Sequence, residues 1–129
     1  MPAALRSLLA VIAGFITLSF VVGLLTQIAI VTLHVRPGQP TPGYLAINVL
    51  YGFLAALAAG YITGLAAGRR PVEHATALAS ITLIAGVISS LHYAGLEPIW
   101  YRWLMILAPP LLMLAGGYIV LRHERTVSR

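Results

Sequence analysis

The sequence predicts an all-α fold, a polytopic membrane protein built as an antiparallel four-helix transmembrane bundle. Of its 129 residues, 60% are hydrophobic and 9% are charged, whereas about a quarter of the residues of a soluble domain carry charge. Uncharged stretches cover residues 7–33, 37–68, 75–96 and 103–121. Each is close to or above the ~20 residues that a helix needs to cross a bilayer. Because the connections are short, we expect one transmembrane domain over residues 1–129.

The four helices are expected at about residues 8–33, 43–67, 75–94 and 100–121. The first stretch is far longer than the ~7–15 apolar residues of a secretory signal, so it is expected to be a retained helix. It ends before "HVRPGQPTPG", whose three prolines and two glycines cannot continue a helix. The segments "RRPVEH" and "GLEP" supply the other two connections.

The arginines predict the orientation of the chain, since positively charged flanks are retained in the cytoplasm. One side carries Arg6, Arg69, Arg70, Arg122, Arg125 and Arg129, and the other carries Arg36 and Arg102. We therefore expect both termini in the cytoplasm. The arginines lie at helix ends rather than on one face, which argues against nucleic acid as a partner. The Ala-, Gly- and Arg-rich, lysine-free composition indicates a GC-rich bacterial genome, so we expect a protein of the bacterial inner membrane.

A stripe of small residues runs along the second helix within "GFLAALAAGYITGLAAG". It consists of Gly52, Ala56, Gly60, Gly64 and Gly68. In lipid, small residues at every fourth position let helix backbones approach closely, so the stripe predicts a packing face. Its expected partner is the third helix, which offers Ala75, Ala79, Thr82, Gly86 and Ser89. The alternative is a partner outside the chain, either a second copy or a larger membrane complex.

Two short segments repeat along the chain. "LAAGYI" at 57–62 recurs as "LAGGYI" at 114–119, and "LH" at 33–34 recurs at 91–92, with offsets of 57 and 58 residues. A tandem duplication of a helical hairpin would produce this pattern. Chance similarity in a chain rich in Leu, Ala and Gly is the other explanation.

Polar residues gather in the outer half of the predicted bundle. Gln27 and Asn48 are expected roughly 7–9 Å deep, at 1.5 Å per residue, where their amides could bond each other. Pro109 and Pro110 leave two carbonyls of the fourth helix without their usual donors. One hypothesis is that these groups join helices, with a Glu97–Arg102 ion pair at the interface. The other is a polar pocket, whose ligand-binding candidates are Gln27, Asn48, His92, Glu97 and Arg102.

Few other residues suggest chemistry. The chain has no cysteine, so thiol catalysis and thiolate metal sites are excluded. Four-helix membrane cytochromes hold haem between paired histidines, and His34 with His92, or His74 with His123, would share a side of the bundle. Because two of these histidines lie at or beyond helix ends beside arginines, we expect no cofactor. No spacing typical of a zinc site, phosphate loop or nucleophile–base pair is present.

The "GYITGLAAGRRPVEHATALA" segment, followed by a second hairpin and an arginine-rich tail, resembles small four-helix bacterial integral membrane proteins of uncharacterised function. The resemblance implies the topology and no activity. We expect a non-catalytic protein that lies in the lipid bilayer and acts through helix contacts, as a homo-oligomer or an accessory subunit of a membrane complex. The alternative is a small-solute transporter or ligand-binding module that uses the outer polar cluster.

Overall fold

Four long helices form the whole fold. The computed structural model describes residues 1–128; Arg129, which entered the orientation count, lies outside them. The helices are α1 (Ala3–Thr32), α2 (Pro42–Ala67), α3 (Pro71–His92) and α4 (Ile99–Val127). Each is long and apolar enough to cross a membrane. The prediction of an all-α protein with four such helices is therefore confirmed.

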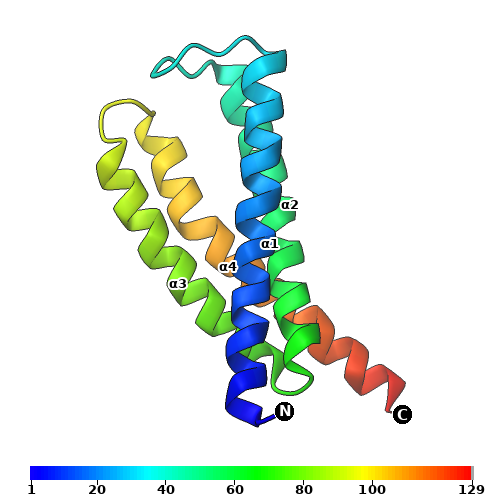
Figure 1. The fold of residues 1–129 in the computed structure, drawn as a ribbon. Coiled ribbons are helices and arrows are strands. Elements are labelled where there is room, and N and C mark those ends of the chain that lie inside the picture. The colour runs from blue at the N-terminus through cyan, green and yellow to red at the C-terminus, as the bar shows by residue number, and fades with distance from the viewer. Residues whose placement is uncertain (129) are drawn as a thin grey trace.

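The helices are arranged as two pairs. α1 packs on α2, α3 packs on α4, and contacts between α2 and α4 join the pairs, whereas α1 and α3 touch only slightly. Loops 33–41 and 93–98 lie at one end of the molecule, which we call the loop end (Figure 1). Both termini and the turn at 68–70 lie at the opposite end, which we call the terminus end (Figure 1). The pairs lean apart toward the loop end (Figure 1).

Local sequence signals set the helix boundaries. The Thr41 hydroxyl accepts a hydrogen bond from the Tyr44 backbone N–H at 3.2 Å and caps α2, as threonine does at many helix starts. α3 begins four residues earlier than expected, because Pro71 occupies its first position, where a proline is well tolerated. α4 continues to Val127, six residues beyond the expected end, since a helix can extend past the apolar stretch.

The stripe of small residues on α2 lies mainly against α4. A Cβ added at Gly60 would lie 2.6 Å from the Cα of Met113, one at Gly64 would lie 3.1 Å from Val120, and one at Gly52 would lie 3.2 Å from Met105. The stripe also meets α3, at Gly64 through Pro71 and at Ala56 through the buried cluster with Leu78 and Ala79. The expectation that α3 is the main partner of the stripe was wrong, because small residues show where a backbone can approach but not which one does.

Gly68 does not belong to the packing face. It follows the last residue of α2 and has a φ of 73°, a left-handed conformation that glycine adopts without strain. The guanidinium of Arg6 lies against it, and Arg6 Nε donates to the carbonyl of Ala66 at 3.1 Å. Gly68 therefore ends α2 and leaves room for an arginine near the negative end of the helix dipole.

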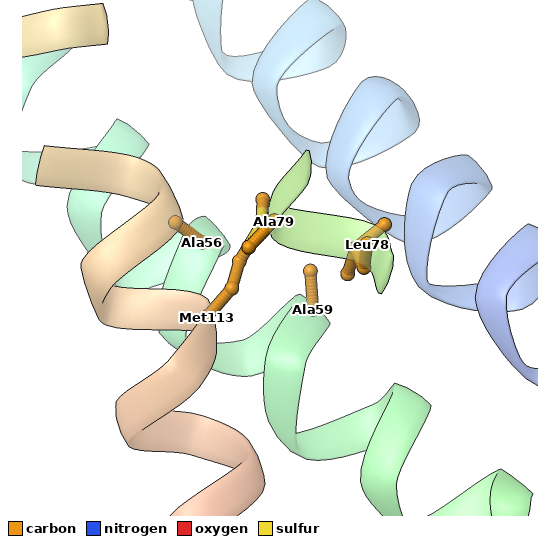
Figure 2. Close-up of a cluster of buried hydrophobic side chains, with 5 residues drawn as sticks. All are labelled: Ala56, Ala59, Leu78, Ala79 and Met113. Atoms are coloured by element: carbon orange, nitrogen blue, oxygen red, sulfur yellow. The ribbon is translucent and has the colours of Figure 1, made fainter. Parts of the chain in front are cut away.

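The core lies where α2, α3 and α4 meet. Its buried cluster consists of Ala56, Ala59, Leu78, Ala79 and Met113 (Figure 2). Met113 and Leu78 are the large members, and alanines fill the space around them. On the side toward α1, Gly14 makes room for Leu78 and Thr63. The core is thus built from close backbone approach rather than from large side chains.

The two repeated segments pack on each other. Gly116 of α4 lies against the carbonyl of Leu57, and a Cβ added there would lie 2.6 Å from the backbone nitrogen of Tyr61. Residues 57–62 and 114–119 therefore meet where the two pairs of helices cross. The similarity of their sequences coincides with the closest contact between the pairs.

Candidate functional site

A buried hydrogen-bond network joins three helices near the loop end. Asn48 of α2 is 6% exposed. Its amide nitrogen donates to the Tyr51 hydroxyl at 2.5 Å, and its carbonyl accepts from the Tyr101 hydroxyl of α4 at 2.5 Å. The hydroxyls of Tyr51 and Thr26 of α1 lie 2.8 Å apart. Asn48 therefore holds α2 to α4 directly and to α1 through Tyr51.

Gln27 is not the partner of Asn48. The amide of Asn48 is engaged by the two tyrosines, so the expected Gln27–Asn48 bond does not form. Consecutive residues of a helix point about 100° apart, and it is Thr26 that faces Tyr51. The expected depth of Gln27 does not determine the direction of its side chain, which lines a cavity instead.

A cavity of about 660 Å³ opens beside this network at the loop end. Side chains of α1, α2 and α3 form its walls, and both loops of that end form its mouth. Its polar lining residues are Thr26, Gln27, Arg36, Tyr44, Asn48, Ser89, Tyr93 and Glu97. The cavity lies where the two pairs of helices lean apart (Figure 1). Its size is within the range of small-molecule sites.

The expected ion pair between Glu97 and Arg102 does not form. Arg102 instead donates from Nε to the Ser90 hydroxyl and from a terminal nitrogen to the Ser90 carbonyl, both at 3.0 Å. Within residues 1–128 the one ion pair joins Arg70 and Glu73 at 3.4 Å. The guanidinium of Arg102 in α4 is thus bonded to Ser90 of α3, and the Glu97 carboxylate lines the cavity.

Glu97 is half-buried in the loop between α3 and α4, and this position raises the pKa of its carboxyl above the ordinary value of 4.5. The cause is the loss of water around the carboxylate, and the nearby positive charge of Arg102 opposes it. Burial disfavours the charged form of an acid that has no hydrogen-bonding partner. The carboxylate form of Glu97 is therefore less stable in the folded protein than in water.

The raised pKa of Glu97 predicts a pH-dependent effect on stability. The folded state binds the Glu97 proton more tightly than the unfolded state, so stability is lost as pH rises above the ordinary value of 4.5. We expect Glu97→Gln to remove this loss. The stability of the variant relative to the wild type should therefore rise between about pH 4 and pH 7. Unfolding midpoints measured in detergent at both pH values test this. If the stability of the wild type instead rises relative to the variant as pH rises, the folded state stabilises the Glu97 carboxylate.

Three of the five candidate ligand residues, Gln27, Asn48 and Glu97, line the cavity. His92 does not, and its ring stacks edge-on against Tyr93 at 4.9 Å. Arg102 lines a smaller, adjoining space of about 200 Å³ between α3 and α4, and Glu97 and Ser89 line both spaces. Met105 and Ile106, whose carbonyls lose their usual donors to the two prolines, line that same smaller space.

The sequence did not reveal every residue at the cavity. Arg36 was read as an orientation signal and Ser89 as part of a packing face, yet both line the cavity. Arg36 lies in a tight turn that the Gln39 N–H closes onto the Arg36 carbonyl at 3.0 Å. That turn, "RPGQ", is visible in the sequence. It could have indicated that loop 33–41 is ordered and holds Arg36 in place.

A second polar cluster lies at the terminus end. The His74 ring bonds the Ser7 hydroxyl through Nε2 at 2.8 Å and meets the Arg70 carbonyl through Nδ1 at 2.9 Å. Both ring nitrogens are therefore occupied, so His74 does not fit the role of a haem ligand. In residues 1–128 no group of three or more His, Asp or Glu could hold a metal ion. The Ser7–His74 bond ties α1 to the start of α3.

Comparison with known proteins adds no assignment. No protein-family model matches the chain, and no curated protein or solved structure shows significant similarity to it. The functional argument therefore rests on the geometry of the cavity and of the helix contacts.

Proposed function

We propose that the chain is a multi-pass protein of the bacterial cell membrane that binds a small solute in the cavity at its loop end. The observation that carries the proposal is the convergence of Gln27, Asn48 and Glu97, from α1, α2 and loop 93–98, on one cavity of about 660 Å³. These three polar residues face an open space that no side chain fills, on the side of the bundle where loops 33–41 and 93–98 meet the helices. Binding is proposed to be non-catalytic, because within residues 1–128 no hydroxyl of the lining is hydrogen-bonded to the Glu97 carboxylate.

The alternative, that the protein acts through helix contacts with a partner, has less support. The stripe that suggested it is occupied within the chain, because Gly60 lies against the backbone of Met113 and Gly64 against Val120. A second copy or a larger complex would have to dock on the remaining apolar surface. That surface, with exposed residues such as Phe20, Leu54 and Ile84, is also what lipid requires.

Cysteine labelling tests whether the cavity is open to water. The chain has no cysteine, so Ser89→Cys introduces a single thiol on the cavity wall. Ile88→Cys is the matched control, because Ile88 is the neighbouring residue and is 63% exposed on the surface proposed to face lipid. A thiol reacts as the thiolate, which apolar surroundings suppress. An impermeant maleimide should label Ser89→Cys at least about tenfold faster than Ile88→Cys; equal rates would contradict a solute site.

The proposed orientation places the loop end outside and both termini in the cytoplasm, with the four helices antiparallel across the bilayer. The arginine distribution supports it, with six on one side and two on the other. Such a chain would be a single transmembrane domain. The contact between residues 57–62 and 114–119 also supports a tandem duplication, since two hairpins related by an axis along the membrane normal bring equivalent helices together.

Impermeant thiol reagents on intact cells test the orientation. We expect Ser128→Cys and Glu73→Cys to be protected and Gln39→Cys to be labelled. None of these changes removes an arginine, and the exposed Arg70–Glu73 pair contributes little to stability. The reverse labelling pattern would place the termini outside.

A further inference from the structure

Two opposite charges line the same cavity. Arg36 comes from loop 33–41 and Glu97 from loop 93–98, so the charges belong to different pairs of helices. No ion pair within residues 1–128 involves either of them. The side chain of Glu97 is half-buried, and a carboxylate in that position gains from a positively charged partner. The cavity therefore presents one anionic and one cationic group at its mouth.

The remaining lining is neutral and mixed. Gln27 offers a hydrogen-bonding amide, and Tyr44 and Tyr93 offer aromatic rings. An ammonium group is attracted both to a carboxylate and to the face of an aromatic ring. The aliphatic part of the wall includes Val22, Ile30 and Leu96. The site thus suits a small molecule that carries charge at two points and has a short apolar or polar body.

We propose that the ligand of this cavity is a zwitterion, with its ammonium group beside Glu97 and its phosphate or carboxylate group beside Arg36. This inference rests on the proposed solute site. A ligand with only a positive charge would pair with Glu97 but be repelled by Arg36. A ligand with only a negative charge would pair with Arg36 but be repelled by Glu97. A zwitterion neutralises both, and each charge-assisted hydrogen bond that it makes strengthens binding. The same chemistry occurs in a free solute and in the ethanolamine phosphate headgroup of a lipid.

Binding of an added compound to the cavity is measured as protection of the Ser89→Cys thiol from maleimide. The zwitterion is sn-glycero-3-phosphoethanolamine, and its two halves, glycerol phosphate and ethanolamine, are the matched controls. The protein is reconstituted in phosphatidylglycerol vesicles. We expect the zwitterion to protect at a concentration at least about tenfold lower than either half, because it makes both charged contacts. Protection by one half alone that equals protection by the zwitterion would overturn the proposal.

Charge variants in the Ser89→Cys background assign the contacts. Glu97→Gln and Arg36→Gln should each weaken protection by the zwitterion about tenfold. Glu97→Gln should abolish the weaker protection by ethanolamine without weakening that by glycerol phosphate, and Arg36→Gln should do the opposite. An equal loss for both halves in both variants would indicate a general structural effect and contradict the assignment.

Vesicle composition separates the two sources of the ligand. If the site takes a lipid headgroup, labelling of Ser89→Cys should already be slow in vesicles containing phosphatidylethanolamine and fast in phosphatidylglycerol alone. If it takes a free solute, the two vesicles should give equal rates and only the added zwitterion should protect. Fast labelling that no probe reduces would overturn the zwitterion proposal and leave the water-filled cavity standing. Failure of the solute site itself appears separately, as equal labelling of Ser89→Cys and Ile88→Cys.

Discussion

Replacing Gly60 with alanine is expected to be among the most damaging single changes in the chain, although it adds only one methyl group. The new Cβ would lie 2.6 Å from the Cα of Met113 and closer still to its carbonyl oxygen. Because the obstacle is backbone, no side chain can rotate away, and α2 and α4 must separate. Overpacking of this kind costs about 1–3 kcal/mol and sometimes more.

The same substitution at other glycines supplies the controls. A Cβ at Gly23 of α1 would meet nothing within 4 Å, so Gly23→Ala should leave stability unchanged or raise it slightly, because alanine favours the helix more than glycine does. Gly52→Ala should cost less than Gly60→Ala, since the atom in its way is the flexible end of Met105. Reversible unfolding in mixed micelles measures all three. If Gly60→Ala unfolds at the same point as Gly23→Ala, the close crossing of α2 and α4 is wrong.

The second large effect is expected at Asn48. Asn48→Leu removes the carbonyl that accepts the hydrogen bond of the Tyr101 hydroxyl, and Tyr101 is only 7% exposed. It also removes one hydrogen-bond partner of the Tyr51 hydroxyl. An unsatisfied buried polar group costs about 1–3 kcal/mol. Tyr51 keeps its bond to Thr26, so most of the loss should come from Tyr101. We therefore expect Asn48→Leu to destabilise the protein by about 1–3 kcal/mol in the same unfolding assay.

A double-mutant cycle isolates this bond. Adding Tyr101→Phe to Asn48→Leu removes the stranded hydroxyl, so the double variant should lose less than the sum of the two single losses. Hydrogen bonds between membrane helices couple by about 0.6 kcal/mol on average and up to about 1.7. Gln27→Leu serves as the control, because Gln27 makes no hydrogen bond with Asn48 or either tyrosine in the described network. Strict additivity of Asn48→Leu and Tyr101→Phe would contradict the network.

Hydropathy and charge predicted the four helices because the length and composition of each apolar stretch identify a helix without information from the rest of the chain. The same signals could not give the start of α3 or the end of α4. Pro71 and the polar residues 122–126 are positions that a helix tolerates at its ends. Boundaries of this kind depend on capping and on continuation into solvent, which hydropathy does not report.

Partners across helices were harder to predict than positions along them. The stripe on α2 indicated close approach, but α3 and α4 both carry small residues, and only packing decided for α4. Asn48 was expected to be buried and bonded, yet its partner Tyr101 lies 53 residues away. Depth along a helix follows from counting residues, whereas the direction of a side chain depends on how each helix rotates about its axis.

The close crossing of α2 and α4 has a mechanical consequence for the cavity. Asn48 lies twelve residues from Gly60 along α2, or about 18 Å at 1.5 Å per residue. Rotation of the two pairs about this crossing would move the cavity walls by about 0.3 Å per degree at this radius. A tilt of about ten degrees would shift Asn48 by about 3 Å relative to Tyr101 and break the hydrogen bond between them. The small residues at the crossing and the Asn48–Tyr101 bond therefore fix α2 and α4 at two points, which limits how far the cavity can widen.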